Sequence, residues 1–487
     1  MRAIASARHS GPSRPRAAPA SVRVLRTSTP AVLMRTTLIA LVLSFASIAH
    51  AQPMDTYGMG SRSIAMGGAV TADVEDFSAN YYNPAGLARG SAMRISMGWY
   101  GAVHDLNVNG ISSNVDALHG AVMGLVVPGR IGDFRFAFGL AVHLPDDAVS
   151  RTRSLPHAQP RWELYDNRGH RAFIAAHLAI RPVEWLMIGG GISFLSLSNN
   201  ALTLRGDLDV AHPSGSHLES SLLANLTTIR YPQAGIQVMP LPELSFGLVY
   251  RGQFLLDSVL TAEVGCPASN PGCPHDAQLT GFGTPFRGYF DLFTESVNAY
   301  VPQQISLGGS WQITPEFRLN AEVTWVNWSA YVSPIGTSNI TLQIDVPDSL
   351  RNTIRIPSSI PGTTPIAANF SDRFVPRVGA EGLAFQDNHV ALRIRGGFFY
   401  EQTPVPDQTG MTTLIDTDRW VWSAGAGLAF TDLRPLINGS LSFDLHLQYA
   451  YLPNRTTRKA SFVDTTGDFV AGGQMFVGGL TMELAFR

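Results

Sequence analysis

The chain contains 487 residues, of which 45% are hydrophobic and only 15% are charged, and its formal net charge is −2. Typical globular proteins carry about 25% charged residues, so this composition suits a soluble chain of several domains poorly. The near-neutral charge gives no argument for a nucleic-acid partner.

The beginning of the chain has the pattern of an export signal. Residues 1–33 are rich in Arg, Pro, Ser and Ala and contain no acidic residue. Met34 is followed by a basic residue, an apolar stretch at Leu38–Ile48 and an A-x-A pattern at 49–51, which together are typical of a secretory signal peptide. The apolar stretch is too short for a spanning helix, which needs about 20 residues. We predict that 34–51 is the signal and 1–33 an over-called extension; a long basic leader or a transit peptide is the alternative.

The next segment, 52–91, is rich in Gly and Ala and carries few charges. It is too small for a domain, and it contains too many turn-forming residues for a strand. Its interpretation therefore depends on the strands that follow it.

Strict alternation of apolar and polar residues recurs along the rest of the chain, which predicts strands with one apolar face. In 440–452, for example, apolar residues from Leu441 to Tyr451 alternate with polar or small residues from Ser442 to Ala450. Segments of this length match strands that cross a bilayer at a tilt, and an even number of them is typical of bacterial outer-membrane barrels. A large secreted all-β protein is the alternative. We predict fourteen strands, at 92–105, 117–128, 132–144, 170–181, 184–198, 223–239, 243–264, 301–313, 316–328, 373–385, 389–401, 419–431, 440–452 and 473–486.

The predicted connections alternate between short turns and long loops, as expected for a barrel with both termini in the periplasm. Tyr and Trp gather near the predicted strand ends, which favours aromatic girdles at the two membrane interfaces. Cys266 and Cys273 fall in one long external loop, where an oxidising compartment favours a local disulfide.

Fourteen strands enclose a lumen that their own side chains do not fill, so such a barrel is either a channel or plugged. Segment 52–91 is the natural plug, because Gly67 and Gly68 allow close packing inside the wall and Pro84 fixes a turn. We therefore predict an all-β fold: a 14-stranded antiparallel transmembrane β-barrel at 92–487 with an N-terminal hatch at 52–91 inside its lumen.

Three stretches resemble the FadL-type outer-membrane transport family, whose members take up long-chain fatty acids or aromatic hydrocarbons. They are GSRSIAMGGAVTADVEDFSANYYNPAGLA at 60–88, WVNWS at 325–329, and LRIRGGFFYEQTPVP at 392–406 followed by LIDTDRW at 414–420. The resemblance implies a bacterial outer-membrane barrel that takes up hydrophobic small molecules passively, by lateral diffusion through the barrel wall. Long-chain fatty acids are the expected ligands. A channel for aromatic hydrocarbons or a general porin is the alternative.

The resemblance also indicates candidate site residues in the hatch. Asn83, Pro84 and Ala85 form its Asn-Pro-Ala motif, which either gates the lumen or is a rigid turn without ligand contact. The lateral opening of the wall would need a bend, and an isolated glycine in a strand often marks one, so we place it at Gly139.

A ligand carboxylate would be met by an arginine, because the guanidinium presents a bidentate fork. Period two places Arg377, Arg393 and Arg395 toward the lumen on adjacent strands, and Arg251 could join them. Structural salt bridges with inward carboxylates are the alternative for each arginine.

The aromatic-rich stretch GFGTPFRGYFDLF lies in a predicted external loop. Such a cluster is costly on an exposed loop unless it has a use. We predict that Phe286, Phe290 and Phe293 capture the hydrophobic ligand; a loop helix packed on the barrel rim is the alternative.

Other classes of function lack support in the sequence. There is no Gly-x-Ser-x-Gly elbow and no convincing Ser/His/acid set, so we expect no enzyme and no cofactor. His143, His177 and His446 are interpreted as polar lumen residues and not as metal ligands. A general porin would need an open lumen, which segment 52–91 disfavours. We expect the protein to be a monomer whose partners are the hydrophobic ligand and outer-membrane lipid.

Overall fold

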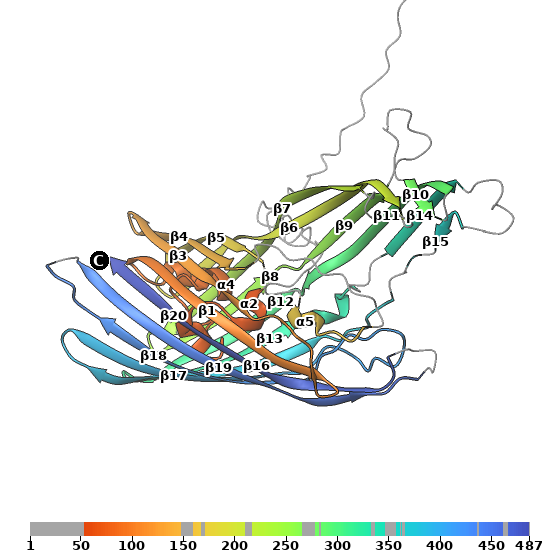
Figure 1. Ribbon diagram of the computed structural model, residues 1–487. Coiled ribbons are helices and arrows are strands. Elements are labelled where there is room, and N and C mark those ends of the chain that lie inside the picture. Colours follow the sequence, from red (N-terminus) through yellow and green to blue (C-terminus); the bar gives the residue numbers. More distant parts are fainter. Residues whose placement is uncertain are drawn as a thin grey trace, which may run out of the picture. The chain divides into compact units, whose positions relative to one another are not determined.

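The computed structural model describes residues 53–147, 159–166, 171–209, 217–264, 278–281, 284–332, 337–345, 357–360, 362, 366–435, 438–460 and 466–486. The chain divides into two units, Met1–Ala46 and Ser47–Arg487, and all described residues belong to the second unit (Figure 1).

Within the described residues, fourteen antiparallel strands close into a barrel, as the sequence predicts. The ring closes because the last strand pairs with the first, from Met93↔Phe486 to Val108↔Ala471. In ring order the strands are β1 (Met93–Val108), β3 (Leu118–Ile131), β4 (Phe134–Pro145), β5 (Phe173–Val183), β6 (Leu186–Asp209), β7 (His217–Leu241), β8 (Leu244–Arg251), β12 (Gln304–Thr314), β13 (Phe317–Val326), β16 (Arg373–Gln386), β17 (Val390–Glu401), β18 (Arg419–Phe430), β19 (Gly439–Thr457) and β20 (Phe469–Phe486).

The wall has the alternating faces that the period-two pattern predicts. On β12, Leu307 and Trp311 expose 55% and 54% of their surface outward, whereas Ser306 and Ser310 expose 0% and 4%. An apolar outer face of this extent suits contact with lipid. None of the described helices is long and apolar enough to cross a membrane.

The two ends of the barrel differ. One end carries tight connections, such as those between β12 and β13 and between β16 and β17, and the first and last strands also meet there, at Met93 and Phe486. We call it the short-turn end. The opposite, long-loop end carries the remaining connections, so the predicted alternation of short and long connections is confirmed.

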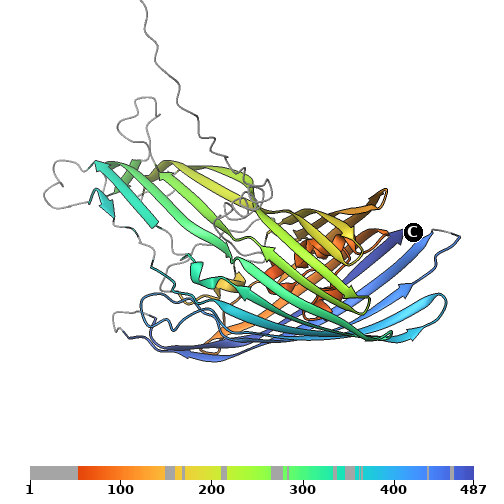
Figure 2. The same cartoon turned by 180° about the vertical axis from the view of Figure 1, so that it is seen from behind.

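Several predicted loops at the long-loop end contain strands, and the sequence prediction is wrong there (Figures 1 and 2). β6 and β7 extend as one long hairpin, and their ladder reaches Asp207↔His217. Backbone groups beyond the membrane still need partners, and continuing a ladder supplies them. The additional strands are β2 (Ile111–Ser112), β9 (Phe254–Val264), β10 (Gln278–Gly281), β11 (Thr284–Val301), β14 (Thr337–Asp345) and β15 (Ser359–Ile360).

Residues 53–91 before the barrel, named the hatch segment below for the role that the sequence predicts, fold into four short helical turns. They are α2 (Pro53–Tyr57), α3 (Ser61–Ala65), α4 (Ala79–Tyr82) and the 3-10 helix η1 (Pro84–Ala88). The segment is bonded to inward side chains of the wall: Asn320 Nδ2 donates to Ala69 O at 2.7 Å, and Thr71 N donates to Glu322 Oε2 at 3.0 Å.

Inward-facing glycines of the wall make room for this segment. A Cβ at Gly397 would lie 2.1 Å from Gly67 N, and a Cβ at Gly235 would lie 2.0 Å from Asn83 Oδ1. The same close approach to the 53–91 segment occurs at Gly124, Gly139, Gly189, Gly247, Gly379 and Gly425. Because these wall positions have no side chain, the backbone of the hatch segment can pack directly against the strands.

The predicted bend at Gly139 is wrong. Gly139 pairs with Val126 on β3 and with His177 on β5, and neither ladder shifts register along β4. A Cβ at Gly139 would lie 2.6 Å from the Leu87 side chain. The glycine thus provides space for the hatch segment, and the pairing of the strand continues past it without a bulge.

Neighbouring glycines on β17 allow a matched test of this packing. Gly397→Val is expected to displace Gly67, because the new side chain would overlap backbone, whereas Gly396→Val should be tolerated, since the nearest atom to its Cβ is 3.9 Å away. Limited proteolysis should cleave 53–91 several-fold faster in Gly397→Val than in Gly396→Val. Gel mobility of the unheated protein checks that both barrels fold. Equal cleavage rates would show that close packing at Gly397 does not hold the segment.

Candidate functional site

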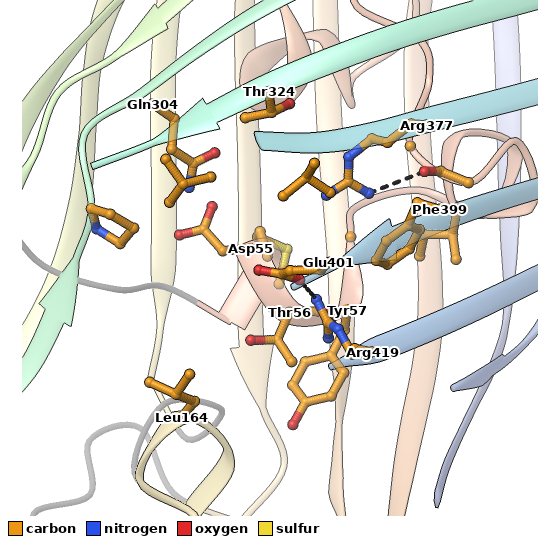
Figure 3. A pocket seen from close by; sticks show the side chains of 18 of the residues that line it. Asp55, Thr56, Tyr57, Leu164, Gln304, Thr324, Arg377, Phe399, Glu401 and Arg419 are labelled. Carbon is orange, nitrogen blue, oxygen red and sulfur yellow. Dashed lines mark hydrogen bonds and ion pairs between the residues drawn. The ribbon is translucent and has the colours of Figure 1, made fainter. Parts of the chain in front are cut away.

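A pocket lies between the hatch segment and the long-loop end of the barrel (Figure 3). Its lining comes from α2, α4, the strands β8, β12, β13 and β16 to β19, and α5 (Glu163–Asp166), a helical turn of a long loop. We call it the upper pocket.

The upper pocket combines aromatic surface with guanidinium groups. Phe399 of β17 is buried, and its ring faces Arg377 at 4.2 Å and Arg419 at 5.3 Å, measured from each Cζ to the ring centroid (Figure 3). Tyr81 lies under Arg251 in the same way, at 4.8 Å. Cation–π contacts of this kind hold arginine side chains flat against an apolar surface. The remaining apolar lining includes Tyr57, Ile64, Tyr82, Leu164, Val326, Trp328 and Val375.

The three arginines of the pocket differ in their partners. Arg419 is paired with Glu401 and donates to Thr56 O at 3.1 Å. Arg377 donates to Gly67 O at 3.1 Å, and Arg251 donates to Gln304 Oε1 at 2.6 Å. Among the described residues, no carboxylate lies within ion-pair distance of Arg377 or Arg251.

The carboxylates of the pocket already accept hydrogen bonds. Asp55 accepts from Tyr81 Oη at 2.7 Å, and Glu322 accepts from the backbone of the hatch segment. Glu401 is paired with Arg419. These contacts link the hatch segment and neighbouring strands around the pocket.

Two long loops meet over the pocket and form what we call the clasp, 159–166 with 402–418. Arg161 N donates to Thr413 O at 3.2 Å, and Ile415 N donates to Arg161 O at 2.9 Å. Leu164 and Tyr165 from one loop and Asp416 and Thr417 from the other line the pocket. The clasp therefore bounds the pocket on the side of the long loops.

Asp416 is a buried acid at the centre of the clasp. Its Oδ2 accepts from Thr403 Oγ1 at 2.6 Å, and its Oδ1 accepts from Tyr165 Oη at 3.3 Å. Burial raises the pKa of Asp416 to about 6; the charge of Glu401 also raises it, and the Thr403 hydroxyl opposes the shift. The clasp thus contains a group that titrates near neutral pH.

A second cavity lies on the other side of the hatch segment and is lined mainly by charged residues. Asp73 of the hatch is paired with Arg62 at 2.8 Å and with Arg318 of the wall at 2.9 Å. Arg395 is paired with Glu381 at 2.6 Å and with Asp444. This lower cavity suits water and ions, and it offers a hydrophobic molecule little favourable contact.

The structure separates the three predicted arginines. All three face the lumen, as the strand pattern predicts, but Arg377 lines the upper pocket, whereas Arg393 and Arg395 line the lower cavity. Met66 and Gly67 of the hatch segment pack between the two levels, against Gly379 and Gly397. A single ligand carboxylate therefore cannot meet all three arginines, and Arg251 lines the upper pocket together with Arg377.

The Asn-Pro-Ala motif lies against β6 and β7 and lines neither described cavity. Asn83 Nδ2 donates to Thr71 O at 2.8 Å and to Ile236 O at 3.1 Å, and Asn83 Oδ1 accepts from Ala85 N. Pro84 and Ala85 are fully buried in η1. These contacts cap a 3-10 helix and attach it to the wall, which agrees with the rigid-turn interpretation.

The predicted capture residues lie on a strand. Phe286, Phe290 and Phe293 belong to β11, so the expectation of an open loop is wrong, and so is that of a rim helix. Phe293 is 39% exposed. Cys266 and Cys273 lie outside the described residues, as do the predicted extension, signal and cleavage position.

Sequence reasoning missed Phe399, Arg419 and the acids of the clasp. Phe399 could have been predicted, because the alternation on its strand places it on the same inward face as Arg and Gly residues. Arg419 lies within the LIDTDRW stretch but was not singled out. Nothing in the sequence joins Asp416 to Tyr165, which is far away along the chain and meets it only through the clasp.

Comparison with known proteins gives a consistent result. Residues 272–457 match the family described as outer membrane protein transport protein (OMPP1/FadL/TodX), and no curated protein matches. Among solved structures, the CymD monoaromatic hydrocarbon channel shares 15% identity and a TM-score of 0.51, over 88% of this chain and 97% of that one. A Pseudomonas aeruginosa FadL homologue shares 17% identity over 90% of this chain and 99% of that one, with a TM-score of 0.49. The Pseudomonas putida toluene transporter TodX shares 14% identity over 88% and 99%, with a TM-score of 0.48.

The family match covers the segment from the external strands to β19, and the CymD channel shares the barrel fold over most of the chain. Together they confirm the resemblance that the sequence motifs indicate. Over residues 272–457 the chain is thus similar to the FadL/TodX family of outer-membrane transport proteins.

Proposed function

We propose that the protein takes up a hydrophobic molecule with a carboxylate head, for which a long-chain fatty acid is the simplest candidate. The observation that carries this proposal is the pair Arg377 and Arg251 in the upper pocket, neither of which has a described carboxylate within ion-pair distance. Arg251 is buried and Arg377 is half-buried, and the nearby charge of Glu322 acts on both. A buried guanidinium is costly without a directly paired anion, and a ligand carboxylate would supply that partner beside an aromatic wall.

The charge of the lower cavity supports a sideways route for this ligand. A hydrophobic tail that moved straight through the barrel would have to displace water from the ion pairs around Asp73 and Glu381, with nothing apolar to replace them. We propose that the hatch segment 53–91 plugs the lumen and that the ligand leaves the upper pocket through the barrel wall.

An aromatic hydrocarbon is the second candidate ligand. The pocket contains Tyr81, Tyr82, Trp328 and Phe399, and flat apolar molecules pack well against such rings. Toluene would fill this surface and leave both arginines without an anion, so the two candidates differ in what happens at Arg377.

Two measurements test the proposed function. Extraction of the purified protein followed by mass spectrometry should recover a fatty acid; recovery of only aromatic hydrocarbons would favour the second candidate. In a liposome swelling assay, the plugged barrel should admit sugars at least tenfold more slowly than an open porin does. Rapid sugar flux would contradict a plugged transporter and would support a general porin.

A further inference from the structure

The hydrogen-bond ladder of the wall is interrupted beside β7. The pairing of β7 with β8 runs up to Gln233↔Arg251 and ends there. The β8 strand continues as β9, but β9 pairs with β11 and then, from Asn200↔Leu260 onward, in parallel with β6. Within the described residues, β7 above Gln233 therefore has no strand partner on the edge that faces β8 and β9.

A strong twist of the β6–β7 hairpin explains the interruption. Two-stranded ribbons twist more than wide sheets do. In the barrel, β7 faces β8, whereas in the extension β6 faces β9, so the ribbon must turn over between these levels. The labelled strands β7, β6, β9 and β11 follow one another in this order in the extension (Figure 1).

The residues at the interruption suit a weak point in the wall. Pro232, directly above the last pair, has no N–H to offer to a neighbouring strand, and prolines in sheets favour edges. Opposite it, Gly252 N donates to Pro232 O at 2.9 Å. A Cβ at Gly252 would lie 3.0 Å from Pro232 Cδ, so only a glycine fits there without strain.

The upper pocket lies directly behind this point. Gln233 Nε2 donates to Tyr81 O at 2.7 Å, and Arg251 Nη1 donates to the same oxygen at 3.2 Å. Both side chains of the last pair are buried, and both are thus held by one hatch residue. Tyr81 and Arg251 also line the upper pocket.

An exposed arginine lies just above the interruption on β7, and exposed apolar residues lie below it. Ala234 and Ile236 are exposed below Pro232, and the exposed Arg230 lies above it, with its guanidinium 6.0 Å from the Phe194 ring centroid. An amphiphile that passed here would place its tail against the apolar band and its head at the level of lipid head groups.

We propose that the transported amphiphile crosses the barrel wall between β7 and β9, over Pro232 and Gly252, with Tyr81 closing the inner side. This inference rests on the lateral route in the proposed function and assigns it a place. Because Tyr81 holds both Gln233 and Arg251, a movement of the hatch segment at Tyr81 would release both edges of the gap together.

Site-specific labelling tests this route. Both native cysteines are replaced by serine, and then Pro232→Cys or Ala234→Cys is introduced. Ala234 is the matched control, since it is exposed on the same face of β7 but pairs with Tyr250 and Gly190. Each variant is reacted with a bulky membrane-permeant maleimide, and intact-protein mass spectrometry confirms equal labelling. Uptake of radiolabelled oleate is then measured in bacteria that lack their own transporter of this family.

Labelling at Pro232→Cys is expected to slow oleate uptake at least fivefold relative to the unlabelled variant, and labelling at Ala234→Cys should change it less than twofold. Equal effects at the two positions, or no effect at Pro232→Cys, would overturn the proposed crossing. The cysteine-free parent separates the two hypotheses: if it does not take up oleate, the fatty-acid function fails, whereas uptake that is insensitive to both labels rejects only the crossing between β7 and β9.

Discussion

Arg377→Met is expected to weaken oleate binding to the purified protein by about 10- to 100-fold. The variant keeps a flexible, unbranched side chain at this position but removes the cation that would meet the ligand carboxylate. A hydrogen bond to a charged group contributes about 1.5–3 kcal/mol, and each 1.4 kcal/mol is about tenfold in the dissociation constant. Oleyl alcohol, which has the same tail but no charge, should bind the variant and the wild type with similar affinity.

Arg393→Met is the matched control for this prediction. Arg393 lies on the neighbouring strand and also faces the lumen, but it lines the lower cavity on the other side of the hatch segment. Its replacement should change oleate affinity less than twofold in isothermal titration calorimetry. If Arg377→Met weakens oleate and oleyl alcohol equally, the arginine shapes the pocket and does not recognise a carboxylate. If neither ligand is affected, the upper pocket is not the fatty-acid site.

The barrel could be predicted from the sequence because its physics is local. Each strand must present apolar residues to lipid at every second position, and this alternation can be recognised within a single segment such as 440–452. The long-loop end obeys no such rule. Water satisfies the backbone of a loop as well as another strand does, so nothing local distinguished β11 from the predicted loop around Phe286 and Phe290.

The candidate site was only partly predictable, because the hatch segment divides the lumen and so determines which cavity each inward side chain lines. Period two gave the inward direction of Arg377, Arg393 and Arg395 correctly. It could not show that Met66 and Gly67 pack between them, so that Arg377 lines the upper pocket whereas Arg393 and Arg395 line the lower cavity. Gly139 shows the same limit, since a glycine that admits Leu87 has the same sequence signal as a glycine that bends a strand.

The clasp is expected to open more readily as the pH rises from 4.5 to 7.5. The pKa of Asp416 is raised from 3.8 to about 6 in the closed clasp, so the closed form binds its proton more tightly than an open, solvated form does. The free energy that favours the closed clasp is therefore largest below pH 3.8. It falls as the pH rises from 3.8 to about 6, and it levels off above pH 6. Between pH 4.5 and pH 6 the loss is roughly 2 kcal/mol, at about 1.4 kcal/mol per pH unit.

Hydrogen exchange of the amides in 402–418, corrected for the intrinsic effect of pH on exchange, measures this opening. In the wild type the opening constant should increase at least tenfold from pH 4.5 to 7.5. Asp416→Asn removes the titrating group and should abolish the increase. Asp407→Asn, in the same loop, replaces an acid whose side chain is 72% exposed and paired with Arg455, and it should keep the wild-type response. A response that persists in Asp416→Asn would assign the pH dependence to another group. An equal loss in both variants would point to a change in the loop as a whole, because only Asp416 is buried between Thr403 and Tyr165.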